Sequence, residues 1–409
     1  MKWLLRLAPV VGFAVIVAGV VMLTASERPA SSQADRDATV AGDTAFAFDL
    51  YHQVAAKDGN LFLSPYSISS ALAMTYGGAH GNTADEMAKT LHFTLPPDKL
   101  HPAYADRLKA LNGPGKRPYE LAIAKALWGQ QGYPWRDEFL ALAKANYGAG
   151  LNPVDFRDSE TARQTINGWV EQQTHDKIKD LLPQGVITPL TRLVLTNAIY
   201  FKGTWARQFD PKRTFDGQFW ANGKTAVQAP LMHQSGEFKF LDGPDLKAVE
   251  LPYAGNELSM LILLPAKLDG AADLEKQLSA DKLTDWTKQM KPTKELAVTL
   301  PKFKFTSQFG LNDQLKALGM KDAFDENKAD FSGMNGGKED VHISAVVHKA
   351  FVEVNEEGTE AAAATGVVMA VRALRQTPTF MADHPFVFVI RDNQSGAILF
   401  LGRVADPTK

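Results

Sequence analysis

The residues tested first are those whose types and spacing could bind a nucleotide or cleave a bond. Residues 113–116, Gly-Pro-Gly-Lys, resemble a phosphate-binding loop, in which backbone N–H groups and a lysine hold phosphate groups. They lack the earlier glycine of that motif, and Arg117 stands where a hydroxyl residue would bind magnesium. A surface turn is the better interpretation. The chain also lacks the Gly-x-Ser-x-Gly, His-Glu-x-x-His and Gly-x-Gly-x-x-Gly patterns of common enzymes.

Metal-binding and thiol chemistry find no support either. The nine histidines are scattered, and His342 and His348 lie six residues apart, which is not a metal-ligand spacing. The chain has no cysteine, so disulfides, thiolate catalysis and cysteine-ligated zinc are excluded. We therefore expect a protein that is not an enzyme, with no catalytic residues, no metal and no cofactor.

The segment from Val354 to Gly366 is the most informative part of the chain. Its sequence, Val-Asn-Glu-Glu-Gly-Thr-Glu-Ala-Ala-Ala-Ala-Thr-Gly, closely resembles the hinge of inhibitory serpins. Further segments match that family in the expected order and together span residues 44–406; they are 61–68, 196–205, 347–351, and 384–386 with 400–403. On this resemblance the chain is identified as a member of the serpin family.

The resemblance implies an α+β serpin fold with a large central, mostly antiparallel sheet, additional sheets, surrounding helices and an exposed reactive loop at about residues 356–380. It also implies a mechanism. A serine protease cuts the loop, the amino-terminal part of the loop enters the sheet as an extra strand, and the acyl-linked protease is dragged across and distorted. The expected function is thus inhibition of a serine endopeptidase by a suicide substrate, in which the trap closes before deacylation.

The hinge residues suit insertion into a sheet, where successive side chains face opposite sides. One set is small or apolar throughout: Thr359, Ala361, Ala363, Thr365, Val367, Met369 and Val371. The hinge charge, Glu360, falls in the other set with Ala362 and Ala364. The hinge as a whole comprises Glu356, Gly358, Thr359, Glu360, Ala361, Ala362, Ala363 and Ala364. Without the family resemblance, a helix would be the preferred interpretation of residues 361–364, because alanine favours helices. A non-inhibitory serpin that serves as a binding protein, or behaves as a substrate, stays as the alternative.

The family count places the bond that is cut. The seventeenth residue counted from Glu356 is Arg372, so the reactive bond is expected to be Arg372–Ala373. An arginine there fills the acidic specificity pocket of trypsin-like proteases. Arg375 is the second choice, because it would need a longer inserted segment.

Two supporting groups follow from the same resemblance. Ser64, Ser67, Asn197 and His348 match a hydrogen-bonded cluster beneath the point where the sheet opens, and buried polar groups of this kind can act as a latch while they stay paired. Trp205, Lys302 and Glu356 match the point at which the loop enters the sheet. Lys302 and Glu356 would form an ion pair there, which contributes little if it is exposed.

The chain must contain elements that position these residues. Its 409 residues are 45% apolar and 22% charged, with no linker-like composition between residues 44 and 405, so we expect a single serpin domain over residues 40–409. Helical spacing marks residues 46–54, 65–76, a segment after Asn82, and 161–177. A short helix is expected between residues 96 and 118. Later segments indicate strands: 193–201, 258–264, 296–300, 351–354, 386–390 and 398–401.

The amino terminus carries an export signal. Lys2 and Arg6 precede the apolar run 7–23, and a polar segment follows. Residues 1–39 are interpreted as a signal peptide or a membrane anchor with a polar linker, and cleavage or anchoring stays open. The expected location is extracellular or periplasmic.

The charge pattern restricts the partners. Forty-four basic and 46 acidic residues are spread without blocks, so we expect no nucleic-acid binding. Some serpins bind sulfated polysaccharides on a basic helix. The matching stretch here has only Lys99, Arg107 and Lys109 beside acidic residues, so heparin-type activation is not expected. The expected partner is a trypsin-like serine protease in a covalent acyl complex, and the inhibitor itself is expected to be a monomer.

Overall fold

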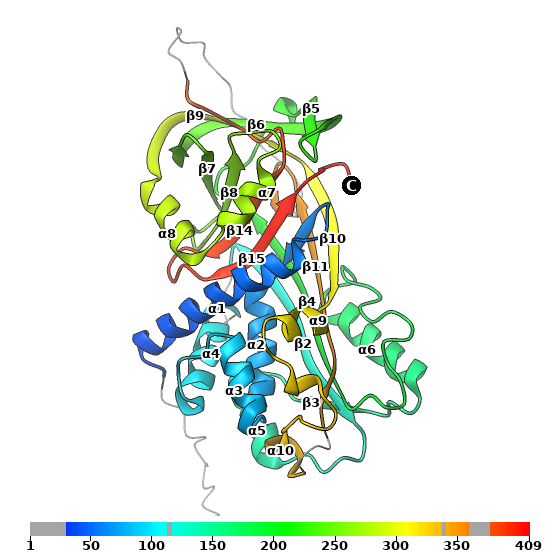
Figure 1. Cartoon of the computed structure of the whole chain (residues 1–409). Coiled ribbons are helices and arrows are strands. Elements are labelled where there is room, and N and C mark those ends of the chain that lie inside the picture. Colours follow the sequence, from blue (N-terminus) through cyan, green and yellow to red (C-terminus); the bar gives the residue numbers. More distant parts are fainter. Residues whose placement is uncertain (1–29, 113–116, 338–340, 360–376) are drawn as a thin grey trace, which may run out of the picture.

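The computed structural model describes residues 30–112, 117–337, 341–359 and 377–409. Two β-sheets run through the molecule, and helices cover them on several sides (Figure 1). The α+β class expected from the sequence is confirmed.

The six-stranded sheet carries the predicted opening point. Its strand order is β10-β11-β12-β4-β2-β3. Within it, β4 and β11 pair in parallel, as do β2 and β3, while the other pairs are antiparallel. The strand bounds are β2 (Tyr119–Gln130), β3 (Leu151–Val154), β4 (Leu193–Thr204), β10 (Phe303–Gly310), β11 (Ile343–Val354) and β12 (Gly358–Thr359).

The nine-stranded sheet lies in the upper part of the molecule in Figure 1. Its order is β1-β15-β14-β8-β7-β6-β9-β13, with β5 paired to β6 and a parallel pair between β9 and β13. Its strands are β1 (Leu61–Leu63), β5 (Phe215–Ala221), β6 (Thr225–Asp242), β7 (Leu246–Pro252), β8 (Leu258–Pro265), β9 (Lys291–Pro301), β13 (Thr379–Met381), β14 (Phe386–Asp392) and β15 (Ile398–Val404).

Helices gather mainly around the lower half of the molecule in Figure 1, with α6 set apart on one side. The α-helices are α1 (Gln33–Val54), α2 (Pro65–Tyr76), α3 (Gly81–Thr90), α4 (Pro97–Asn112), α5 (Asp137–Tyr147), α6 (Ser159–Gln173), α7 (Ala271–Gln277), α8 (Ala280–Gln289), α9 (Asn312–Ala317) and α10 (Ser332–Asn335). Short 3₁₀ turns lie at Pro211–Arg213 and Asp322–Phe324.

Helix α2 lies at the centre and contacts β2, β4 and β15. Every residue from Pro65 to Thr75 is buried, because the segment is small or apolar on all sides. Its start is well defined: Ser64 caps the helix by accepting a hydrogen bond from the Ser67 N–H, and Pro65 occupies the first turn. This cap brings two of the predicted latch residues under the sheet.

The structure differs from the sequence-based expectation at several elements, among them α1, α4 and β2. Helix α1 begins at Gln33, so the last residues of the predicted linker 1–39 are helical; a capping box between Ser32 and Asp35 stabilises that start. The helix predicted as short, α4, has 16 residues and continues through Pro102. Strand β2 was not predicted, because its alanine-rich sequence has no strong strand pattern.

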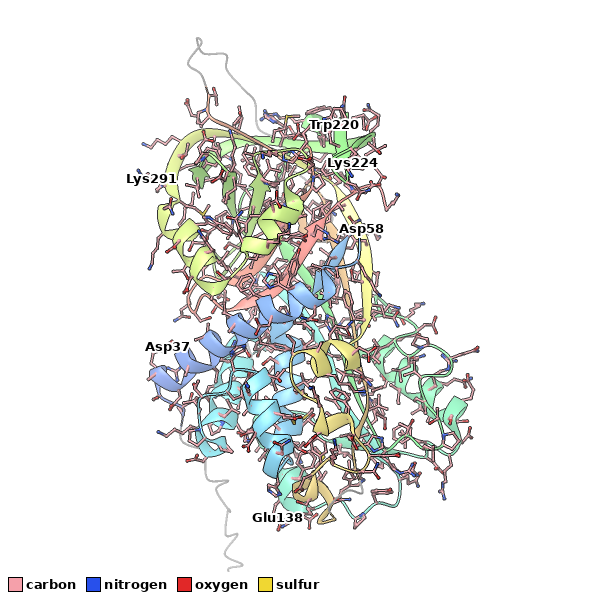
Figure 2. All side chains as sticks on the ribbon, viewed as in Figure 1. Asp37, Asp58, Glu138, Trp220, Lys224 and Lys291 are labelled. Carbon is pink, nitrogen blue, oxygen red and sulfur yellow. The ribbon has the colours of Figure 1, made fainter. Side chains whose placement is uncertain are left out.

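Charged side chains are distributed over the periphery, and labelled examples such as Asp37, Glu138 and Lys291 extend outward at separate places (Figure 2). One basic residue of the candidate polysaccharide stretch is not on the surface: Arg107 is buried, and its Nη1 lies 2.6 Å from Asp43 Oδ2. Across the described ranges, no helix has the length and apolar character needed to cross a membrane. The apolar run 7–23 lies outside these ranges.

Candidate functional site: the sheet latch and the insertion point

The four predicted latch residues form one closed ring of hydrogen bonds. The Ser64 backbone N–H donates to His348 Nε2 at 3.1 Å, and His348 Nδ1 lies 2.7 Å from Asn197 Oδ1. Asn197 Nδ2 donates to the Ser67 carbonyl and hydroxyl oxygens at 2.8 and 2.7 Å. The Ser67 N–H donates to Ser64 Oγ at 3.2 Å, which closes the ring. All four residues are buried, so the structure brings the whole predicted cluster together.

The ring fixes His348 as a neutral imidazole. A backbone N–H can only donate, so Nε2 accepts from Ser64 and the ring proton lies on Nδ1, from which it is donated to Asn197 Oδ1. Burial lowers the pKa of His348 to about 3, although the contact with Asn197 opposes this shift. A second proton on the ring would face the Ser64 N–H without an acceptor.

The latch lies across the seam between β4 and β11. His348 in β11 is the direct register partner of Asn197 in β4, and the two strands pair in parallel over residues 343–351 and 193–200. A strand inserted between them would separate their axes by about one more strand spacing, roughly 4.8 Å. The hydrogen bond between His348 and Asn197 cannot survive that separation. The ring therefore joins β4 and β11 at this point, and a strand inserted between them would have to break it.

Above the latch the two strands part and hold β12 between them. Gly358 and Thr359 pair antiparallel with Thr204 and Gly203 of β4, and Thr359 also pairs with Val354 of β11. Thr359 is 1% exposed. The first hinge residue predicted to be buried on insertion is thus already buried in the sheet.

Gly358 is the residue that permits this close approach. Its φ is 153°, in the range that side chains disfavour, and a Cβ placed on it would overlap the carbonyl oxygen of Gly203. Any other residue at this position would have to push β12 out of the gap.

Aromatic residues cover the start of β12. Trp205 donates from its indole Nε1 to the Asn355 carbonyl at 3.0 Å and stacks on Tyr253 at a centroid distance of 4.6 Å. The Tyr253 hydroxyl lies 2.9 Å from the Thr359 hydroxyl. Burial raises the pKa of Tyr253, so the phenol stays protonated. Tyr253 was not predicted as a site residue, and no sequence signal marked it.

Glu356 anchors the chain where it enters the sheet. Its Oε2 lies 2.9 Å from Lys302 Nζ, and its Oε1 accepts from the Thr214 hydroxyl at 2.8 Å. Burial opposes ionisation of Glu356, but hydrogen bonds from Lys302, the backbone and Thr214 outweigh it and lower the pKa. The side chain of Glu356 is 11% exposed and that of Lys302 is 37% exposed, so the pair is more protected than a surface ion pair.

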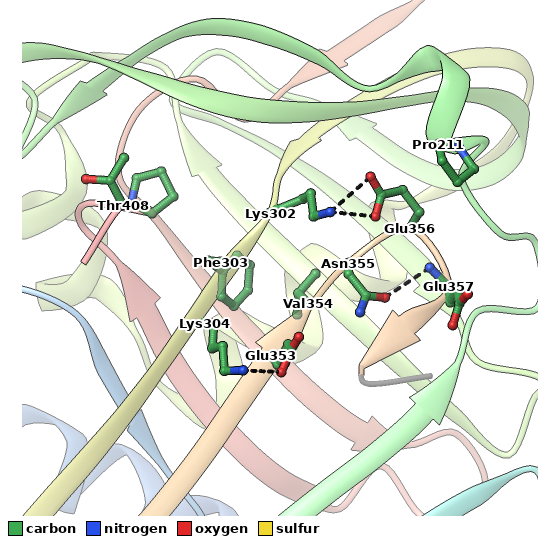
Figure 3. A pocket seen from close by; sticks show the side chains of 11 residues that line it. Pro211, Lys302, Phe303, Lys304, Glu353, Val354, Asn355, Glu356, Glu357 and Thr408 are labelled. Atoms are coloured by element: carbon green, nitrogen blue, oxygen red, sulfur yellow. Dashed lines mark hydrogen bonds and ion pairs between the residues drawn. The ribbon is translucent and has the colours of Figure 1, made fainter. Parts of the chain in front are cut away.

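Lys302 and Glu356 line a cavity of about 460 Å³ beside the start of β10 and the end of β11 (Figure 3). Figure 3 shows Lys302 reaching Glu356 just outside β10 and β11, and Lys304 reaching Glu353 within these two strands. Trp205, Lys302 and Glu356, predicted at the insertion point, are therefore brought together there. The remaining hinge residues Glu360 to Ala364, the reactive bond Arg372–Ala373 and Arg375 lie outside the described residues.

Metal binding has no support in the described part of the chain, where no cluster of three or more potential ligands occurs. The arrangement suits a conformational change of the sheet. A polar ring joins β4 and β11, and the short strand β12 lies between the same two strands at the upper end of the seam.

Comparison with known proteins agrees with this geometry. A family model described as Serpin (serine protease inhibitor) matches residues 41–407. The human leukocyte elastase inhibitor is 44% identical over 375 residues, which cover 89% of this chain and 98% of that protein. Serpin48 of the insect Tenebrio molitor superposes with a TM-score of 0.81 at 33% identity, covering 92% and 99% of the two chains. Human thyroxine-binding globulin gives 0.83 at 32% identity, covering 92% and 100%.

Proposed function

This chain belongs to the serpin family, and we propose that it inhibits a trypsin-like serine protease as a suicide substrate that is cut between Arg372 and Ala373. The family is one of protease inhibitors rather than catalysts. The finer points, namely the type of protease, the bond and the covalent trapping, are the content of the proposal.

The observation that carries the proposal is the position of β12. The seam between β4 and β11 opens at its upper end to receive two residues, and the inward-facing one, Thr359, is buried among aromatic residues. In a loop that no longer inserts, the close approach of Gly358 to Gly203 and the contact of Thr359 with Tyr253 would serve no purpose. After cleavage, the chain beyond Thr359 would continue along the same seam.

The register of Thr359 supports the choice of the bond. With Thr359 buried, the alternation of a strand buries every second residue up to Val371, and all of these are small or apolar. Arg372 follows this last buried position. The side chain of an arginine pairs with the carboxylate at the base of a trypsin-like specificity pocket.

The test is incubation with trypsin followed by denaturing electrophoresis and mass spectrometry. The proposal expects a complex that survives denaturation and a released carboxyl-terminal fragment that begins at Ala373. A fragment beginning at Gln376 would show that Arg375 is the bait. Cleavage with no complex would reject inhibition and favour the substrate-like alternative.

A non-inhibitory binding role is the second candidate. One structural relative is named a thyroxine-binding globulin, so the fold is compatible with ligand transport. The fitted β12 argues for inhibition, because a transport protein does not require a seam that is ready to accept a strand. The trypsin experiment separates these two candidates.

We also propose that the protein is exported by its amino-terminal segment and acts outside the cytoplasm as a monomer, without nucleic acid or heparin as a partner. The sequence of residues 1–26 and the burial of Arg107 in α4 support this proposal. Fractionation of the producing cells, with the mass of the mature protein, tests export and distinguishes cleavage from anchoring.

A further inference from the structure

A second cavity, of about 380 Å³, lies beside β2 at the edge of the six-stranded sheet. Strand β3 pairs with β2 only from Leu127 onward, so the preceding part of β2 forms an open edge on that side. The cavity lies along this edge and is bordered by α4, the end of α5 and α6. No latch or insertion-point residue lines it, although one of its lining residues, Lys125, is the register partner of Asn197.

The lining combines apolar surface with a single base. Leu108, Ile123, Tyr147 and Trp169 supply aliphatic and aromatic surface, and the amide side chains of the lining are Asn112, Asn152 and Gln173. Among the lining residues that the structure describes, none is acidic and Lys125 is the only base. This is the composition of a site for a small molecule with an apolar body and an acidic group.

Lys125 is an unusual residue for the interior of a sheet. It is 7% exposed, and its Nζ donates to the Ser70 hydroxyl of α2 at 2.7 Å. The same Nζ lies 5.2 Å from the centroid of the Tyr147 ring, a favourable cation–π position. An ammonium has three donors, and the described residues supply one hydrogen-bond acceptor for them.

Among the described residues, no carboxylate pairs with the Lys125 ammonium. Its neighbours Ser70 in α2 and Asn197, its register partner in β4, are uncharged. On the α5 side, burial raises the pKa of Tyr147, and His101 behind it in α4 has a pKa lowered by burial to about 4. Burial without a charged partner lowers the pKa of Lys125 to about 7. A buried ammonium without a charged partner lowers the stability of the fold, unless a bound ligand pairs with it.

We propose that this cavity binds a small organic carboxylate, with the carboxylate paired to the Lys125 ammonium and the apolar body lying among Leu108, Tyr147 and Trp169. A carboxylate would accept the donors that Ser70 leaves unused and would supply the missing negative charge. The pair is buried, so each partner stabilises the charged form of the other. Ligand and proton therefore bind together.

The test uses sodium benzoate as the probe and benzamide as its neutral analogue, with calorimetry on the full chain. Benzoate is expected to bind at about pH 6 and to lose affinity by about tenfold per pH unit above about pH 7, because binding then requires proton uptake. Benzamide should bind more weakly and without this pH dependence. Lysine side-chain NMR should show the titration midpoint of Lys125 rising when benzoate is present. No protease is involved, so the result is independent of the proposed inhibitory function.

Variants locate the site. Lys125→Met should abolish benzoate binding, whereas Lys109→Met, which removes an exposed lysine from adjacent α4, should leave it unchanged. Leu108→Trp fills the cavity while keeping Lys125 and should also abolish binding, so the test does not depend on the folding of a single variant. The proposal is overturned if benzoate fails to bind, if the affinity is insensitive to pH, or if the cavity-filling variant binds normally.

Discussion

At the scale of single residues, the hydrogen-bond ring of the latch depends on the protonation state of His348. Its ring accepts from the Ser64 N–H on one side and donates to Asn197 on the other, so the neutral form satisfies both nitrogens. In the charged form Nδ1 still donates to Asn197, but the protonated Nε2 is a donor that faces the Ser64 N–H, which is also a donor. Such a network stabilises only while it is complete.

We expect acid to weaken the fold through His348. Its pKa is about 3 when folded and about 6.5 when unfolded, so between these values the unfolded chain binds one more proton. Stability is fully present above pH 6.5 and falls with decreasing pH by about 1.4 kcal/mol per unit from this group, until about pH 3. The urea midpoint of His348→Gln should depend less on pH in this window. The exposed His175→Gln serves as control, and parallel pH profiles for the wild type and His348→Gln would contradict the assignment.

Thr359→Arg should convert the inhibitor into a substrate. Thr359 is buried and contacts Tyr253, so a guanidinium there must either be desolvated at a cost of several kcal/mol or expel β12 from the seam. The yield of denaturation-resistant complex with trypsin should fall at least about tenfold, with cleaved inhibitor accumulating instead. Thr359→Ser keeps the hydroxyl and should keep the complex. An unchanged yield for the arginine variant would refute a role for this position in insertion.

Arg372→Leu should change the specificity and leave the trap intact. The substitution removes a charge-assisted contact with the protease, worth about 1.5–3 kcal/mol, which corresponds to about a tenfold to hundredfold slower reaction with trypsin. A leucine suits apolar specificity pockets, so complexes with chymotrypsin or elastase should appear. Arg375→Leu is the matched control and should leave trypsin inhibition unchanged. If the control loses inhibition instead, the count from Glu356 is three residues short.

At the scale of elements, segments with a strong local pattern were predictable and segments determined by distant contacts were not. The buried runs in β4 and β8 and the capped start of α2 were predicted from residue type and spacing. Strand β2 was not, because Ala124 and Ala126 are small in order to pack beneath α6, a requirement that no local pattern reveals.

The candidate site also contains residues that were predicted and one that was not. Its latch and its insertion point were predicted from the family resemblance. Tyr253 meets Thr359 across 106 positions of sequence, a contact that no local pattern predicts.

We expect Gly358→Ala to disrupt β12 specifically. The added methyl group would overlap the Gly203 carbonyl, so β12 should leave the seam and complex formation with trypsin should drop. Gly336→Ala is the control: Gly336 also has positive φ, at 78°, but nothing lies within 4 Å of the added Cβ. That variant should lose only about 1 kcal/mol of stability and keep inhibition. Equal inhibition by the two variants would argue against a role for β12.

At the scale of the whole molecule, the intact protein is expected to be less stable than its own cleaved form. In the intact chain β4 and β11 pair directly through the latch, whereas the cleaved chain could fill the seam with a full strand. Cleavage with trypsin should raise the thermal midpoint by at least about 10 °C. Each kcal/mol of added stability shifts the midpoint by roughly 2 °C in a protein of this size, and an extra strand should add several kcal/mol. Scanning calorimetry before and after cleavage checks this, and equal midpoints would exclude strand insertion.

The two residues of β12 also bear on how fast the trap can close. Adding a strand to a sheet has a slow beginning, in which chain entropy is lost before many contacts form, and a faster continuation. Gly358 and Thr359 already pair with β4, and Thr359 also pairs with β11, so on the proposed mechanism the added strand has started before any protease arrives. What would remain is propagation along the seam, which has to separate the direct β4–β11 pairs from Phe351 and Tyr200 onward and then the ring around His348. On the proposed mechanism, the lifetime of these contacts, rather than the search for a starting point, would set how fast loop insertion competes with deacylation.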